Sequence, residues 1–189
     1  MVDQILELRQ YTLKPGTREG FVERFEREFL ETQEAVGIHV LGTFLDLDDP
    51  DRFVWFRGFA SLDERARSLT AFYGGPVWAA WGNETNDDLI DSDDVLMLQP
   101  RPGKPGMPVS AYGELAIRVW AISSDAEESS LEAAIDAGGG DVLLSHPGPN
   151  NFRLPVRDDQ VIVALGGDNL PDGHIQHLRL APTTRSALR

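Results

Sequence analysis

The sequence contains no cysteine, which excludes disulfide bonds, thiolate metal sites and a cysteine nucleophile. Lysine is almost absent too: Lys14 and Lys104 are the only lysines, and the other 15 of the 17 basic residues are arginines. So few lysines disfavour a mechanism through a lysine Schiff base. A GC-rich genome explains the preference for arginine without a functional reason.

Positive charge and long hydrophobic runs are scarce as well. The 31 acidic residues give a net charge of −14, which argues against nucleic acid or an anionic membrane as a partner. No apolar run approaches the length of a membrane span, and the N-terminus lacks the pattern of a signal peptide, so we expect a cytoplasmic protein. A chain of 189 residues with 41% hydrophobic residues is long enough to bury a substantial core.

The first predicted strand carries the most chemistry. Residues 6–16 alternate apolar and polar side chains and end in Pro-Gly, which is typical of a strand followed by a turn. Leu6 and Leu8 lie on one face, which we expect to pack under the next helix. The other face is expected to line a cavity and carries an acid, a cation and an amphipathic ring: Glu7, Arg9 and Tyr11. An ion pair that only fastens the sheet is the alternative.

Periodicity and turn residues predict the other elements of the first hundred residues. Phenylalanines four residues apart predict a helix over 17–36. A capping box at Ser61 opens a second helix, and Pro76 is well placed in the first turn of a third. Alternating or apolar stretches predict further strands, and a polar, acidic stretch predicts an exposed loop: the strands over 38–45, 52–59 and 95–98, and the loop over 83–94.

The second half repeats the first in a shorter form. Arg118-x-Trp120 matches Arg9-x-Tyr11, and a capping box at Ser124 opens a helix to about residue 137. A counterpart of the third helix is missing, and the other elements are apolar or alternating stretches: 112–122, 142–145, 151–154, 161–165 and 175–180. This order predicts an α+β fold of two ferredoxin-like β-α-β-β units, the second of them degenerate.

The predicted organisation has four segments. The first unit covers 1–100, a proline-rich linker covers 101–111, the second and shorter unit covers 112–182, and a disordered tail covers 183–189.

Three stretches in this order resemble proteins of the NIPSNAP family: residues 6–16, residues 53–59 with Arg65 after them, and residues 72–78. The resemblance implies the dimeric α/β-barrel superfamily, in which two ferredoxin-like sheets face each other and enclose a cavity. Because the second half is similar to a degenerate copy of the first, the barrel could close within one chain, and a homodimer is allowed but not required. Relatives in this superfamily include cofactor-free oxygenases acting on aromatic polyketides, cyclases, dehydratases, isomerases and haem-binding enzymes.

We expect the cavity to be lined by residues of both units. His39 is the candidate general base because a neutral imidazole suits that role near neutral pH, and Glu7 would orient it. Arg9, Arg57 or Arg118 would stabilise a developing oxyanion. Tyr11 completes the catalytic set, and the remaining substrate-binding candidates are aromatic or polar: Trp55, Trp78, Trp81, Glu114, Trp120 and His146. Core packing and structural ion pairs are the alternative roles for these residues.

These residues predict a small-molecule enzyme, such as a tailoring enzyme for aromatic natural products, that uses general acid/base chemistry without an organic cofactor or a metal. Oxygenase, cyclase, hydrolase and isomerase activities all remain open. One alternative is a non-catalytic module that binds a small molecule or a protein. Another is a haem-binding barrel protein, with His39, His146 or His177 as the iron ligand.

Overall fold

The computed structural model describes residues 3–103, 107 and 113–188. The first unit runs through β1 (Ile5–Leu13), α1 (Arg18–Arg24), η1 (Phe25–Phe29), α2 (Leu30–Glu34), β2 (His39–Asp46), β3 (Arg52–Phe59), α3 (Leu62–Tyr73), α4 (Pro76–Asp87) and β4 (Leu89–Pro100). The second unit runs through β5 (Leu115–Ala121), α5 (Asp125–Ala137), β6 (Asp141–Ser145), β7 (Val161–Leu165) and β8 (Gln176–Pro182). Together α1, η1 and α2 form one continuous helix in which η1 is a turn of π-helix.

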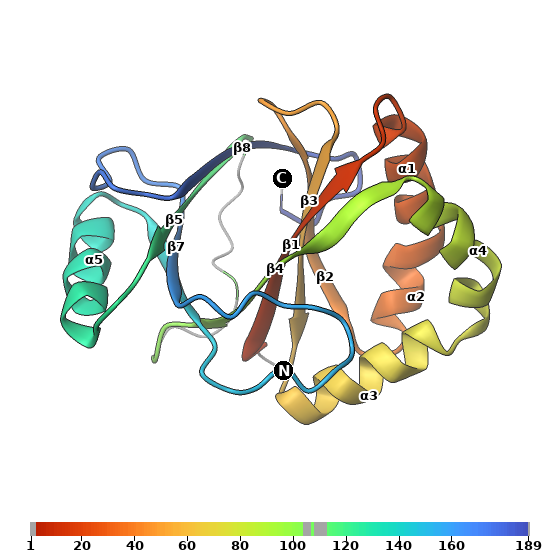
Figure 1. The fold of residues 1–189 in the computed structure, drawn as a ribbon, viewed down its shortest axis with the longest axis horizontal. Helices are drawn as coiled ribbons and strands as arrows, with labels where there is room; N and C mark the ends of the chain where they lie inside the picture. Colours follow the sequence, from red (N-terminus) through yellow and green to blue (C-terminus); the bar gives the residue numbers. More distant parts are fainter. Residues whose placement is uncertain (1–2, 104–106, 108–112, 189) are drawn as a thin grey trace.

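The strands form one closed antiparallel barrel in the order β1-β3-β2-β8-β5-β7-β6-β4. Each unit contributes four neighbouring strands in the order fourth, first, third, second, so the two units have the same ferredoxin-like arrangement. The seams between the units are the antiparallel pairs β2 with β8 and β4 with β6. The barrel therefore closes within one chain, and the equivalent strands β1 and β5 lie on opposite sides of it (Figure 1).

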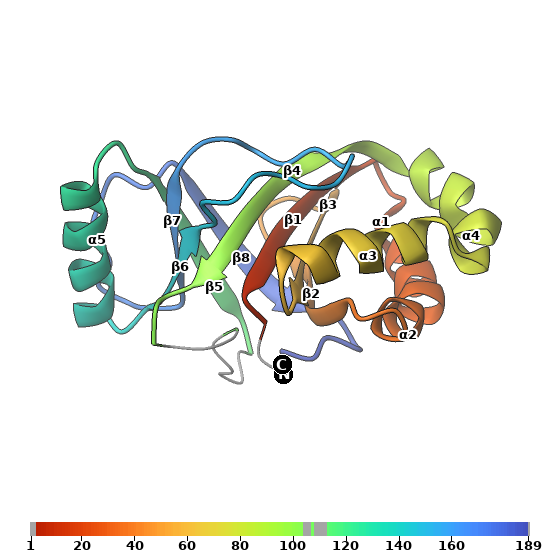
Figure 2. The same cartoon turned by 90° about the horizontal axis from the view of Figure 1, so that it is seen from below.

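Aliphatic side chains fill the interior of the barrel. Alternate residues of the strands point inward and form one buried cluster, to which β1 contributes Leu6 and Leu8 and β5 contributes Ile117. Helices cover two opposite outer sides: α1 to α4 lie over the first unit and α5 lies over the second (Figures 1 and 2). Both faces of β1 are thus buried, one by the barrel core and the other by the helices.

The orientation of β1 is the reverse of the one expected from the sequence. Leu6 and Leu8 point into the barrel, whereas Tyr11 packs among the aromatic side chains of the helices. A closed barrel needs an apolar lining on its inside, and the aliphatic face of β1 supplies it. The expectation that β1 and β5 line the same cavity is therefore wrong, because Arg9 and Arg118 face outward on opposite sides of the barrel.

Two further expectations about elements are wrong. The stretch 83–94 is not an exposed loop: α4 continues to Asp87, and β4 begins at Leu89. The stretch is polar because it is exposed. Its helical part lies on the surface, and its strand part has no β6 neighbour, since β6 pairs with β4 only from Leu98 onward. The stretch 151–154 is part of a long loop and is not a strand.

The second unit is degenerate in the predicted way. The connection from β7 to β8, residues 166–175, contains no helix, whereas the equivalent connection of the first unit holds α3 and α4. The tail over 183–189 is not disordered in its described part, because the Thr43 amide donates to Ser186 Oγ (3.1 Å) and Leu188 packs into the barrel core. Most of the predicted linker over 101–111 lies outside the described residues, as does Tyr112. No described helix is long and apolar enough to cross a membrane.

Candidate functional site

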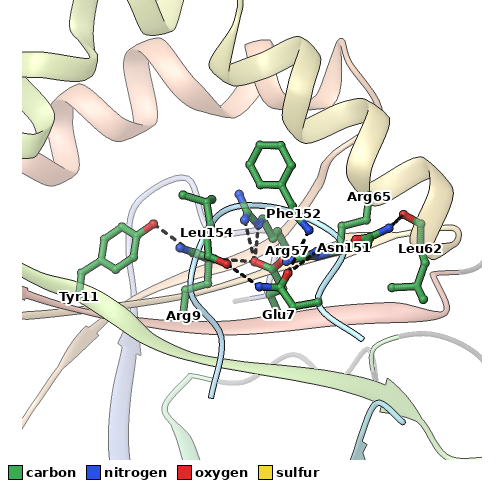
Figure 3. A network of polar contacts seen from close by, with 10 residues as sticks. Glu7, Arg9, Tyr11, Arg57, Leu62, Arg65, Asn151, Phe152 and Leu154 are labelled. Atoms are coloured by element: carbon green, nitrogen blue, oxygen red, sulfur yellow. Dashed lines mark hydrogen bonds and ion pairs between the residues drawn. The ribbon is translucent and has the colours of Figure 1, made fainter. Parts of the chain in front are cut away.

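A buried ionic network lies on the outer face of the first unit's sheet, beneath the helices (Figure 3). Glu7 on β1 is fully buried and accepts hydrogen bonds from Arg9 Nη1 (2.7 Å) and Arg57 Nε (2.7 Å) on its Oε2, and from Arg65 Nε (2.6 Å) on its Oε1. The register of β1 and β3 places Glu7 directly opposite Arg57, and Arg65 comes from the first turn of α3. Three elements thus converge on one carboxylate.

The network carries a net positive charge, because one carboxylate serves three buried guanidinium groups. Burial by itself would raise the pKa of the Glu7 carboxyl, but the three arginines together hold that pKa well below its usual range, so Glu7 stays ionised. The Arg57 guanidinium carbon lies 5.3 Å from the ring centre of Trp55 and 5.5 Å from that of Phe59. These aromatic faces stabilise part of the positive charge that Glu7 does not neutralise.

A cavity of about 230 Å³ adjoins the network, between the sheet and the helices. Half of its lining residues are aromatic, and six of these come from β3, the first long helix, α3 and α4: Phe21, Phe25, Phe29, Trp55, Phe72 and Trp78. Phe25 and Phe29 are the two ends of the π-helical turn η1. Such turns are rare and are frequent at functional sites, which marks this wall as a candidate ligand surface.

Arg9 and Tyr11 form the end of the cavity that lies on the sheet. Arg9 Nε donates to Tyr11 Oη (3.1 Å), while Arg9 Nη2 makes no hydrogen bond with any described residue. Burial raises the pKa of the Tyr11 phenol, although the Arg9 guanidinium acts in the opposite direction, so the hydroxyl keeps its proton at neutral pH. Since the Tyr11 oxygen already accepts a hydrogen bond, its proton can be donated to a ligand.

Three buried polar atoms of cavity-lining residues have no hydrogen-bond partner: Gln33 Oε1, Trp55 Nε1 and Thr85 Oγ1. Buried polar groups without a partner are uncommon in folded proteins, because each costs about 1–3 kcal/mol. They lie on α2, β3 and α4 around the same cavity, which indicates a site built for a ligand with its own donors and acceptors. Among the described residues, neither a carboxylate nor a histidine lines this cavity.

The long loop between β6 and β7 covers the site from the second unit (Figures 1 and 3). Arg65 Nη1 donates to Asn150 Oδ1 (3.1 Å) and to Asn151 Oδ1 (2.8 Å). Asn151 Nδ2 donates to the backbone carbonyl of Leu62 in α3 (2.6 Å), and Leu154 lines the cavity. The two units therefore contribute to one site, through this loop and not through paired strands.

His39 lies on the opposite face of the sheet from Glu7. The registers pair both His39 and Leu6 with Gly58, so His39 belongs to the inward-facing set, and its side chain is partly exposed. Its Nδ1 lies 2.7 Å from Asp3 Oδ1. The expectation that Glu7 orients His39 is wrong, because Glu7 is occupied by the arginines and Asp3 holds the imidazole.

Other predicted site residues do meet at the cavity or in the network beside it: Glu7, Arg9, Tyr11, Trp55, Arg57 and Trp78. Trp81 does not line the cavity, and its ring lies 5.7 Å from the guanidinium of Arg27. His146 lines a different cavity beneath the β6–β7 loop, where burial lowers the pKa of its imidazole.

The predicted residues of β5 lie far from this site. Arg118 donates to the carbonyl of Gly167 (3.2 Å), and Trp120 Nε1 donates to the carbonyl of Asp172 (3.3 Å). Glu114 is exposed just before the strand. No residue of β5 lines the aromatic cavity, which lies over the first unit's sheet.

The sequence-based reasoning missed several residues of the site. Arg65 stands at helical spacing with the buried Leu69 and Phe72, so its place on the inner face of α3 could have been found from periodicity. Asn150 and Asn151 carry no such signal, because their contacts join positions more than 80 residues apart.

A model of the NIPSNAP family matches residues 6–103, which is more than half of the chain and nearly all of the first unit. The chain belongs to the NIPSNAP family. No curated protein matches it.

Solved structures show how the chain differs from other NIPSNAP proteins. A NIPSNAP-like domain protein from Burkholderia xenovorans shares 26% identity at a TM-score of 0.50, over 57% of this chain and 94% of that chain. A NIPSNAP protein of unknown function from Agrobacterium tumefaciens shares 24% identity at a TM-score of 0.50, over 56% of this chain and 95% of that one. Nearly all of each relative thus corresponds to little more than half of this chain.

A third structure is similar over both units. A putative monooxygenase from Lactobacillus acidophilus shares 10% identity at a TM-score of 0.58, over 95% of this chain and 94% of that chain. At this identity the likeness shows the fold alone, which is a dimeric α/β-barrel type fold contained in one chain.

Haem, which the barrel superfamily implies for some members, needs an axial ligand from the protein. None of His39, His146 and His177 lines the aromatic cavity. The residues of this cavity therefore do not fit a histidine-ligated haem.

Proposed function

We propose that this NIPSNAP protein is a small-molecule enzyme whose outer cavity binds a flat, largely apolar ligand and stabilises negative charge on one ligand oxygen. The observation that carries the proposal is the pairing of Arg9 with Tyr11 at the sheet-facing end of an aromatic cavity. Fixed donors aimed at a developing oxyanion are worth most in a site of low dielectric constant, and both side chains are buried.

The geometry supports a simple division of roles. The ligand ring would lie among Phe29, Trp55 and Trp78, with its oxygen near Tyr11 Oη and Arg9 Nη2. A phenol or enol bound there would lose its proton to solvent and become a phenolate or enolate. Tyr11 would donate a hydrogen bond to this oxygen and Arg9 would supply positive charge, so that both lower the pKa of the bound ligand.

An oxygen anion of this kind is electron-rich and is a common starting point for oxygenation, cyclisation and isomerisation. The fold shared with a putative monooxygenase is compatible with the first of these. The aromatic wall favours an aromatic natural product as the substrate class. We propose electrostatic catalysis without an organic cofactor, in which Tyr11 and Arg9, and not His39, act on the substrate.

The probe for this proposal is 2-naphthol, because its neutral and ionised forms differ in absorption. We expect the wild type to bind 2-naphthol and to lower its pKa, so that the spectrum of the anion appears at a lower pH than in buffer. Tyr11→Phe should weaken binding about 10- to 100-fold, because a hydrogen bond to a charged group contributes about 1.5–3 kcal/mol. His39→Ala is the matched control on the opposite face of the sheet and should behave as the wild type. The absence of binding, or a pKa shift that depends on His39 and not on Tyr11, overturns the proposal.

A module that binds the same ligand without turnover is the second candidate. The observation that favours it is the absence of a carboxylate or imidazole among the described residues that line the cavity. Incubation of the protein with a panel of phenols in air, followed by mass spectrometry, separates the two candidates. A product that Tyr11→Phe no longer forms supports the enzyme, whereas tight binding without any product supports the module.

A further inference from the structure

Arg153 is the second charged residue that lines the aromatic cavity, and it is cationic like Arg9. It belongs to the β6–β7 loop and is exposed, whereas Arg9 is buried on the sheet. The two arginines therefore mark the mouth and the inner end of the same cavity.

Arg153 is unusual among the arginines of this chain. Of those that the structure describes, it alone makes neither an ion pair nor a hydrogen bond with another described residue. The chain carries 31 acidic and 17 basic residues, so carboxylates are abundant, and even the exposed Arg179 pairs with Asp48 (3.0 Å). An unpaired guanidinium at a cavity mouth is unexpected in so acidic a protein.

Aromatic contacts hold Arg153 in position without occupying its donors. Its guanidinium carbon lies 5.9 Å from the ring centre of Phe152. Phe152 in turn stacks on Tyr73, with ring centres 6.0 Å apart and planes inclined by 26°. Tyr73 is itself part of the cavity wall. The Arg153 guanidinium is thus held at the mouth of the cavity, and its N–H donors remain open to a ligand.

We propose that Arg153 recognises a carboxylate on the ligand, at the end opposite the oxygen that Arg9 and Tyr11 hold. This inference rests on the proposed function of the cavity and narrows its substrate class to a flat aromatic acid with an acidic hydroxyl at one end and a carboxylate at the other. The guanidinium fork matches a carboxylate in a two-point contact. The net charge of −14 repels an anionic ligand, so a cationic group at the mouth also directs such a ligand to the cavity.

Two probes that differ in one carboxylate test the inference. The wild type should bind 6-hydroxy-2-naphthoate about 3- to 10-fold more tightly than 2-naphthol, as expected for a partly exposed charge-assisted contact. Arg153→Gln should remove this difference and leave the affinity for 2-naphthol unchanged. Isothermal titration calorimetry at low and high salt measures both affinities, and the preference should shrink as salt screens the contact.

Arg179→Gln is the matched control, because it removes one exposed positive charge of β8 and should leave the preference intact. An equal preference in the wild type and in Arg153→Gln overturns the inference while leaving the proposed function in place. Loss of the preference in both variants also overturns it, since the effect would then come from net charge. Failure of the wild type to bind either probe overturns the inference and the proposed function together.

Discussion

At the scale of single residues, the site depends on Glu7, whose carboxylate is shared by three buried arginines. Glu7 holds the Arg9 guanidinium toward the cavity, because Arg9 Nη1 donates to the Glu7 carboxylate while Arg9 Nε donates to Tyr11. The same group therefore stabilises the fold and positions the cation that we assign to the ligand oxygen.

Glu7→Gln should lower the free energy of unfolding by about 3–5 kcal/mol at pH 7, since it leaves the buried arginines without a counter-charge. The native pKa of Glu7 lies below the ordinary value, so its contribution is fully present above the unfolded-state pKa near 4.5 and declines as the pH falls below it. Urea denaturation at pH 7 and pH 4 measures both effects. Equal stability of the two proteins at pH 7 would contradict this role of Glu7.

Unlike Glu7, Thr85 lowers the free energy of unfolding. Its buried hydroxyl has no hydrogen-bond partner, and valine has nearly the same shape. Thr85→Val should therefore raise the free energy of unfolding by about 1 kcal/mol and weaken the binding of 2-naphthol. Thr70→Val is the control, because the Thr70 hydroxyl donates to the carbonyl of Ala66 (2.7 Å) on an exposed helix face. A loss of stability in Thr85→Val with unchanged binding would show that the hydroxyl has a structural role.

At the scale of elements, the sequence predicts which helices and strands form better than it predicts which way their faces point. The capped helices α3 and α5 begin where Ser61 and Ser124 predict, because each serine side chain accepts a hydrogen bond from the amide three residues later. Alternation in β1 correctly separates the aliphatic face from the polar one. It cannot tell which face is inside, because the barrel core and the helix layer bury both.

The β6–β7 loop is the element whose role no local pattern predicts. Asn151→Ala removes its contacts with Arg65 and with the carbonyl of Leu62. We expect faster hydrogen exchange and faster proteolysis within the loop, with a loss of about 1–2 kcal/mol in the free energy of unfolding. Asn169→Ala is the control, because that exposed side chain makes no hydrogen bond with the described residues. Identical exchange rates in both variants would mean that Asn151 does not anchor the loop.

At the scale of the whole molecule, the two units share one hydrophobic core inside the barrel. The resemblance to NIPSNAP proteins predicted this barrel, but only the pairing of β2 with β8 and of β4 with β6 shows that it closes within one chain. The duplication is unequal, since the first unit carries the aromatic cavity and the second contributes a loop to it.

The shared core predicts that the units unfold together. Leu143, fully buried in β6, belongs to the core, and Leu143→Ala should cost about 2–5 kcal/mol. In a Trp120→Phe background, fluorescence comes from the three tryptophans of the first unit alone. We expect their urea midpoint to fall when Leu143 is truncated in the second unit. A midpoint that does not move would show that the units unfold independently.

The central claim is that the ligand binds outside the barrel, between the sheet and helices of the first unit. A crystal structure of the protein with bound 2-naphthol tests it most directly. The account predicts the naphthol rings among Phe29, Trp55 and Trp78, with the oxygen within hydrogen-bond distance of Tyr11 Oη and Arg9 Nη2. Rings bound inside the barrel or beside His39, or an oxygen that points away from Arg9, would contradict it.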